Sequence, residues 1–126
     1  GAPLLMGIVN LAPDSFSGDG LSAEAAIARG RAMIAAGADI LDIGGESTRP
    51  GAAPVPPEEE CRRILPAIRA LAPLAPVSVD TRNAATMAAA LAAGARIVND
   101  VSALRHDPGA ARVVAAAGVP VALMHM

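Results

Sequence analysis

Residues 39–51 read DILDIGGESTRPG, and residues 6–17 read MGIVNLAPDSFS. In each stretch a run rich in Ile, Leu and Val changes abruptly to Gly, Asn, Asp, Glu, Ser, Thr and Arg. This change is typical of a buried parallel strand that delivers functional groups into the loop at its carboxyl end. The two stretches therefore predict a parallel α/β sheet with a functional site along one edge.

Ala-rich helical segments and short apolar strands alternate through the rest of the chain. Three helical segments stop at Gly37, Gly94 and Gly118, where glycine can take the left-handed conformation that ends a helix. Strict alternation of this kind predicts a parallel sheet. We predict strands over 4–10, 39–44, 77–80, 97–100 and 119–125, and helices over 22–36, 57–72, 84–93 and 108–117.

The predicted helix ends carry capping residues. Ser22 can cap the first helix, and Pro57 with the three glutamates after it suits the first turn of the second. Asp107 followed by Pro108 places a cap before the fourth helix. Pro66 lies inside the second helix, so we expect a kink or a local break there.

Both a doubly wound sheet and a (β/α)₈ barrel satisfy this alternation. No G-x-G-x-x-G follows the first strand, which removes the usual support for a dinucleotide-binding sheet. Five strands cannot close an eight-stranded barrel. The barrel interpretation therefore expects one domain over 1–126, a partial barrel of about five strands and four helices that is truncated at its C-terminal side.

Composition excludes several classes of function. The net charge is −2, from 12 acidic and 10 basic residues that are interspersed, which gives no electrostatic footprint for nucleic acid or an anionic membrane. No apolar run has the length of a membrane span, and no secretory signal is recognisable. A single cysteine, Cys61, fits a reducing cytoplasm and is expected on a helix face.

Each predicted strand ends in side chains that can bind a ligand. In a barrel these ends share the face that holds the active site. The candidates in chain order are Asn10, Glu46 through Arg49, Asp80, Asn99 with Asp100, and His125.

The loop that begins at Asn10 admits two interpretations. Asn10 and Asp14 offer a neutral and a charged oxygen that suit Mg²⁺, directly or through water. The same residue types also favour a simple turn. The length of the segment, which runs up to Ser22, favours a functional loop. Phe16, the single aromatic residue, is either a ligand contact or a plug over the strand ends.

The other strand ends leave similar choices. In the loop from Gly44 onward, glycines, hydroxyls and the forked cation of Arg49 favour an anion site, whereas the alternative is a rigid turn in which Arg49 pairs with Glu46. Asp80 is a binding group, a helix cap or a partner for Arg82. Asp100 could orient the neighbouring Asn99. A lone histidine at the end of an apolar strand, such as His125, is more often a satisfied structural group than a catalyst.

The two opening stretches closely resemble the signature stretches of the dihydropteroate synthase family. The strand ends SVDT at 78–81, VND at 98–100 and MHM at 124–126 follow in the family's order. The resemblance covers the whole length. It implies a (β/α)₈ barrel that condenses 6-hydroxymethyl-7,8-dihydropterin diphosphate with p-aminobenzoate, using Mg²⁺ and releasing pyrophosphate.

By position, the resemblance also assigns residue roles. In the pterin site, an acid and an amide would read the guanidine-like ring edge. The assigned residues are Asn10 (catalytic, Mg²⁺ and the diphosphate side), Arg49 (catalytic, diphosphate contact), Thr48, Asp80 and Asn99 (pterin), Phe16 and Pro50 (walls of the aminobenzoate pocket) and Met124 (pterin floor).

The chain departs from the family pattern in two respects. The family usually has valine and threonine before the proline of the first loop, where this chain has Leu11 and Ala12. The family's aspartate after strand six, lysine after strand seven and arginine–histidine pair after strand eight have no positions here. We therefore expect the chain alone to be inactive or nearly so. The resemblance also implies that the parent protein is a homodimer.

Two other functions fit the same residues. One is a methyltetrahydrofolate-dependent methyltransferase, a different barrel with ring-reading strand ends. The other is a non-catalytic homologue that only binds pterin. The loop at 46–50 and the first loop favour the synthase.

Overall fold

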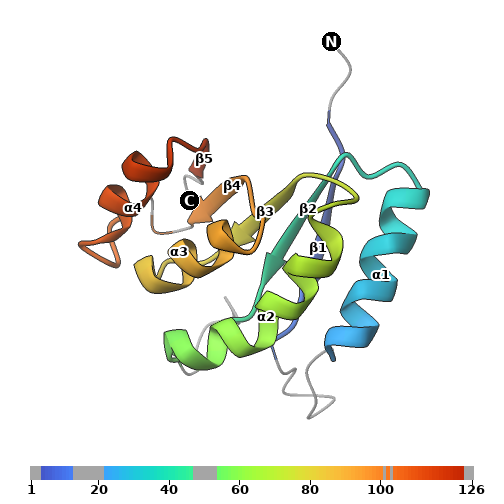
Figure 1. The fold of residues 1–126 in the computed structure, drawn as a ribbon, viewed down its shortest axis with the longest axis horizontal. Helices are drawn as coiled ribbons and strands as arrows, with labels where there is room; N and C mark the ends of the chain where they lie inside the picture. The colour runs from blue at the N-terminus through green and yellow to red at the C-terminus, as the bar shows by residue number, and fades with distance from the viewer. Residues whose placement is uncertain (1–3, 13–21, 47–53, 101, 103, 124–126) are drawn as a thin grey trace.

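The computed structural model describes residues 4–12, 22–46, 54–100, 102 and 104–123 (Figure 1). Within these ranges, strands and helices alternate along the whole chain, as predicted. The elements are β1 (Met6–Asn10), α1 (Ala23–Ala35), β2 (Ile40–Gly44), α2 (Pro57–Leu71), β3 (Val77–Asp80), α3 (Ala84–Ala92), β4 (Ile97–Asp100), α4 (Ala110–Ala117) and β5 (Val121–Leu123).

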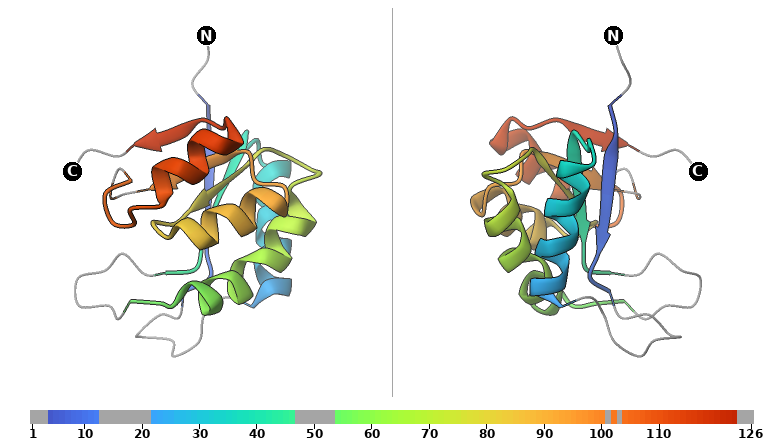
Figure 2. Two further views of the ribbon diagram at one scale, coloured as in Figure 1. Left: turned by 60° about the vertical axis from the view of Figure 1, so that its left-hand side comes forward. Right: turned by 90° about the vertical axis from the view of Figure 1, so that its right-hand side faces the viewer.

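All the strands of this part of the chain belong to one parallel sheet in the order β1-β2-β3-β4-β5. The helices lie together on one side of it (Figure 2). A doubly wound sheet would reverse its strand order and carry helices on both faces. The observed arrangement is therefore the partial (β/α) barrel of the prediction, with each helix packed outside its strands.

The core forms between the sheet and these helices. Strand residues on the helix side, among them Val9, Leu41 and Val79, are fully buried against them. The alternate residues of β1 face the other side of the sheet, where no described helix covers them. Met6 and Ile8 are accordingly 45% and 64% exposed. One face of the sheet is thus packed against the helices. The other, which we call the open face, is covered by none of the described helices.

The capping predictions are largely confirmed. The Ser22 hydroxyl accepts a hydrogen bond from the Ala25 N–H, and α2 begins at Pro57. The three predicted stop glycines all have positive φ angles. No break occurs at Pro66, because α2 continues through it to Leu71.

The predicted start of the fourth helix is wrong by two residues. It begins at Ala110, not at Pro108, since residues 107–109 form a turn. Asp107 accepts the Gly109 N–H within this turn and the Ala84 N–H at the start of α3. These two donors hold the pKa of Asp107 below its ordinary value. Its carboxylate therefore joins two helix starts rather than capping one.

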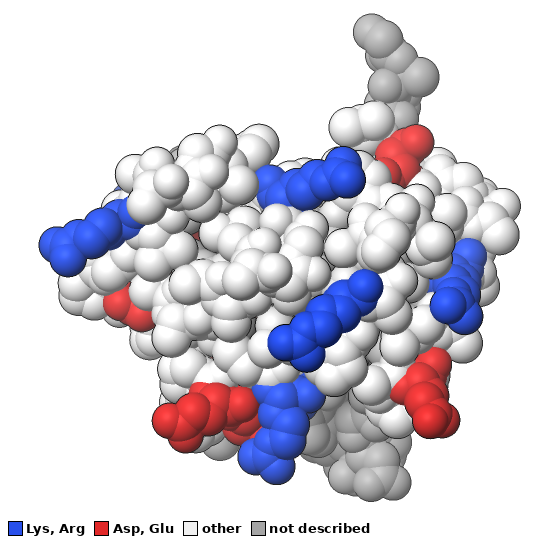
Figure 3. Space-filling view, in the orientation of Figure 1, with Lys and Arg blue, Asp and Glu red and all other residues white. Residues whose placement is uncertain are grey.

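The described surface shows no patch of one charge on the face drawn in Figure 3, where basic and acidic side chains are interspersed. Cys61 lies half-buried on α2, on a helix as predicted. None of the helices described is both long and apolar enough to cross a membrane.

Two of the stop glycines form a matched pair for a stability test. Gly37 and Gly94 have φ angles of +109° and +120°, which L-residues rarely adopt. A Cβ at position 94 would lie 2.8 Å from the Ala72 Cβ, whereas one at position 37 would meet nothing within 4 Å. Gly94→Ala should therefore lower the free energy of unfolding by about 1–3 kcal/mol more than Gly37→Ala. Urea denaturation measures both, and equal losses would contradict the packing at Ala72.

Candidate active site

The register of the strands gathers polar side chains on the open face of the sheet. Asp42 is paired with Ser78, and Gly44 with Asp80. Asp80 is in turn paired with Asn99. Since residues paired between parallel strands share a face, as do residues two apart in one strand, all these side chains lie on the face that the helices leave open.

An amide–carboxylate contact crosses this face. The Asn99 Nδ2 donates to both carboxylate oxygens of Asp42, at 3.3 Å each, although the two residues are 57 apart in sequence. They stand on β4 and β2, about 10 Å apart with β3 between them. Their side chains therefore meet over β3, and both residues are buried, with exposed fractions of 7% and 4%.

Two polar atoms beside this contact have no hydrogen-bond partner in the described structure. They are the Oδ1 of Asn99 and the hydroxyl of Ser78, and both are buried. A buried polar atom without a partner costs free energy, so such atoms concentrate where a ligand supplies the missing bond. The open face thus offers an acceptor and a hydroxyl that its own chain leaves unused.

Asp80 is the most perturbed acid of the site. Burial is the largest cause that raises its pKa, and the negative charges of Asp42, Glu60, Asp100 and Glu46 add to it, so that the pKa lies at about 7. Burial likewise raises the pKa of Asp42, while the nearby Ser78 hydroxyl, which makes no full hydrogen bond, and the Asn99 amide partly offset the effect. A donor-rich ligand that approached these acids would favour their ionised forms.

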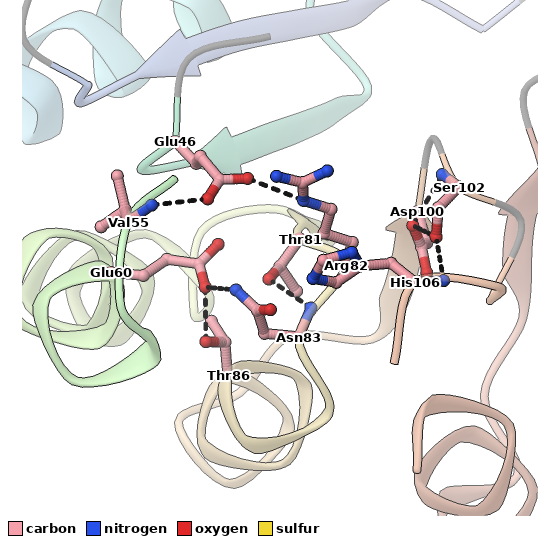
Figure 4. A network of polar contacts seen from close by, with 10 residues as sticks. All are labelled: Glu46, Val55, Glu60, Thr81, Arg82, Asn83, Thr86, Asp100, Ser102 and His106. Carbon is pink, nitrogen blue, oxygen red and sulfur yellow. Dashed lines mark hydrogen bonds and ion pairs between the residues drawn. The ribbon is translucent and has the colours of Figure 1, made fainter. Parts of the chain in front are cut away.

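Both structural alternatives for Asp80 are wrong. Arg82 donates through Nε to Glu46 at 3.0 Å (Figure 4). No hydrogen bond or ion pair joins it to Asp80 among the contacts described. The α3 start is capped from elsewhere, because its Ala84 N–H donates to Asp107. Asp80 is therefore left facing the site.

Glu46 uses both carboxylate oxygens at the base of the loop that follows β2. One accepts from Arg82 and the other accepts the Val55 N–H at 2.8 Å (Figure 4). The predicted alternative, a turn in which Arg49 pairs with Glu46, concerns a residue outside the described ranges. In the described part Glu46 is a structural anchor and not a group that faces Asp42 and Asn99.

Asp100 does not orient Asn99. Adjacent strand residues face opposite sides of a sheet, so Asp100 points away from the open face. Its carboxylate accepts from the Ser102 N–H, the Ser102 hydroxyl and the Leu104 N–H. Asp100 therefore shapes the loop after β4.

Asn10 is exposed at the carboxyl end of β1, and its Oδ1 accepts the Ala12 N–H at 2.8 Å. This contact is the turn that the sequence left as one alternative. No cluster of three or more His, Cys, Asp or Glu able to hold a metal occurs among the residues described. A single amide oxygen nevertheless fits Mg²⁺, which takes few protein ligands and retains water or phosphate oxygens.

The remaining predicted site residues lie outside the described ranges, and their roles stay predictions. They are Asp14, Phe16, Thr48, Arg49, Pro50, Met124 and His125.

Asp42 is the residue that sequence reasoning missed. The signal was present, because a carboxylate inside the apolar strand ILDIG is rarely buried without a partner. It stands two residues before the strand end, whereas we considered only the ends themselves. Counting by two from Gly44 would have placed Asp42 on the open face.

The family described as "Pterin binding enzyme" matches residues 6–126. The chain belongs to this family. Bacillus subtilis dihydropteroate synthase is 47% identical over 126 residues, which are 97% of this chain and 44% of the relative. The chain thus spans less than half the length of that relative.

Solved structures show the same likeness. Xanthomonas albilineans dihydropteroate synthase with 4-aminobenzoic acid is 55% identical, with a TM-score of 0.89 over 98% of this chain and 46% of that one. Yersinia pestis dihydropteroate synthase in a sulfonamide drug complex is 46% identical, with a TM-score of 0.90 over 98% and 46%. The fold of the chain is therefore that of the corresponding part of these enzymes.

The raised pKa of Asp80 predicts how stability depends on pH. Folded Asp80 binds its proton up to about pH 7, whereas an unfolded aspartate releases it near pH 3.9. Between these values the folded state binds more protons, so the free energy of unfolding falls as pH rises. Relative to Asp80→Asn, the wild type should lose about 2–4 kcal/mol between pH 4 and pH 7. Parallel denaturation profiles for the two proteins would contradict the raised pKa.

Proposed function

We propose that the protein containing this chain is a dihydropteroate synthase. It would join 6-hydroxymethyl-7,8-dihydropterin diphosphate to p-aminobenzoate, releasing pyrophosphate, in folate biosynthesis. The observation that carries the proposal is the buried polar cluster on the open face, in which Asn99 bridges to Asp42 beside Asp80. The likeness to enzymes of this activity supports it.

The cluster suits the pterin ring. A pterin presents ring nitrogens and an exocyclic amine along one edge, which resembles a guanidine and donates hydrogen bonds. Ionised Asp42 or Asp80 would accept from that edge, and the unused Oδ1 of Asn99 would accept a further bond. The flat ring would thereby be held at a fixed angle over β3.

The reaction needs orientation and leaving-group stabilisation more than a strong base. The attacking aryl amine is weakly basic, and its target is the methylene carbon that bears the diphosphate. Asn10 would lend one oxygen to Mg²⁺, which would neutralise charge on the departing diphosphate. Arg49 would donate to the same group. The pterin contacts would keep the carbon in line with the amine.

Two further parts of the proposal concern the whole protein. We infer a cytoplasmic location, because a single cysteine is typical of a reducing compartment. We also infer a homodimer, from the family resemblance. Equilibrium sedimentation of the full-length protein would test the homodimer.

Asp42→Asn tests the pterin assignment in the full-length protein. The change preserves size but replaces an acceptor with a donor against the ring edge, so kcat/KM for the pterin diphosphate should fall about 10- to 100-fold. Pyrophosphate release that depends on p-aminobenzoate measures it.

Asp39→Asn is the matched control. Asp39 lies three residues earlier, at the opposite end of β2, where it accepts only the Leu5 N–H among the bonds described. It should leave kcat/KM unchanged. Equal effects of the two substitutions would contradict a pterin site on the open face.

Inhibition distinguishes the synthase from the other two functions. A sulfonamide mimics p-aminobenzoate, so it should compete with that substrate in a synthase. A methyltetrahydrofolate-dependent methyltransferase would be insensitive to it. Tight pterin binding without pyrophosphate release would indicate a non-catalytic homologue.

A further inference from the structure

The turn that follows Asp80 is held by three carboxylates from three different parts of the chain. Each of the consecutive residues 82–84 donates to one of them (Figure 4 shows the first two). The bonds are Arg82 Nε to Glu46, Asn83 Nδ2 to Glu60 and Ala84 N–H to Asp107. The strand end that presents Asp80 is thereby tied to the loop after β2, to α2 and to the loop after β4.

The bond to Glu46 differs from the other two in what it connects. Glu46 also accepts the Val55 N–H at 2.8 Å, and the preceding carbonyl of Gly45 accepts from Arg63 of α2 at 2.8 Å. The Glu46 carboxylate therefore joins the two ends of the β2–α2 loop: Glu46 itself, just after β2, and Val55, just before α2. Arg82 joins that carboxylate to the β3 end, two residues beyond Asp80.

We propose that Glu46 and Arg82 are positioning residues for the reaction. Their ion pair fixes the base of the β2–α2 loop against the strand end that carries Asp80. Because Gly44 and Asp80 are register partners, this base stands at the rim of the polar cluster. The pair would hold this rim in a fixed position relative to a pterin bound to the polar cluster. This role rests on the proposed function.

The exposure of the pair argues against a role in stability alone. The Arg82 side chain is 35% exposed and that of Glu46 is 14% exposed. Water partly screens the pair at its Arg82 end, so its contribution to the free energy of unfolding should be modest. The fully buried Glu60, which accepts from Asn83 and Thr86 at 2.9 Å and 2.5 Å, already anchors the same turn to α2. The Glu46–Arg82 contact therefore adds a fixed position of the β2–α2 loop base relative to the end of β3.

A double-mutant cycle in the full-length protein tests the proposal. Arg82→Gln and Glu46→Gln should each lower kcat/KM about five- to twentyfold, and the double variant should be no worse than either one, because the two residues act as a unit. The affinity for a pterin without a diphosphate, measured by calorimetry, should stay within about twofold, since the cluster below the rim is intact. Urea midpoints should shift only slightly, because the Arg82 end of the pair is partly screened by water.

Arg62→Gln is the matched control. Arg62 pairs with Glu59 at 2.8 Å on α2, and its side chain is 77% exposed. Removing this pair should change neither turnover nor pterin affinity. Arg82→Lys keeps the charge without the Nε donor and should recover part of the lost kcat/KM.

Each outcome decides the proposal. Loss of turnover that is coupled between Glu46 and Arg82, with pterin affinity kept, supports it. Active variants that match Arg62→Gln would overturn it and leave the proposed function standing. A parallel fall in pterin affinity and urea midpoint would also overturn it, since the pair would then be structural. A wild type that releases no pyrophosphate would overturn the proposed function and this inference together.

Discussion

Parallel register decides which side chains of this chain can act together. Because neighbouring strands run in the same direction and pair residue for residue, each strand contributes alternate side chains to a packed face and to an open one. Valine, leucine and isoleucine occupy the packed face against the helices. Asp42, Ser78, Asp80 and Asn99 occupy the other. A slip of one residue in β2 or β3 would bury Asp42 or Asp80 in the core and abolish the site.

The open face stores an electrostatic cost that a ligand can relieve. The negative charge of Asp42 helps to raise the pKa of Asp80, and no described ion pair reaches either of them. The Asn99 amide partly compensates Asp42 but leaves its own Oδ1 without a partner. Such incomplete satisfaction is rare in a core and typical of binding sites. The unsatisfied polar groups thus lower the stability of the free protein, and a ligand that satisfies them would gain binding free energy.

Local signals in the sequence predicted the fold well, whereas the contacts of the site depend on tertiary structure. Glycine stops, the Ser22 cap and apolar runs are local, so element order and most boundaries followed from them. The start of α4 did not, since Asp107 bonds across to α3. The partner of Arg82 is 36 residues away and could not be inferred from spacing. Asp42 had a local signal inside its strand, but its contact with Asn99, two strands away, is visible only in the fold.

The most direct test of this account is ¹³C NMR of the aspartate carboxyl carbons in the full-length protein, with Asp80→Asn to assign the signal. Asp80 should titrate at about pH 7 in the free protein. Saturation with a pterin should lower that pKa by at least about one unit, because hydrogen bonds donated by the ring edge favour the carboxylate. Titration near pH 4 in the free protein, or a pKa that saturating pterin leaves unchanged, would contradict a pterin site built on Asp80.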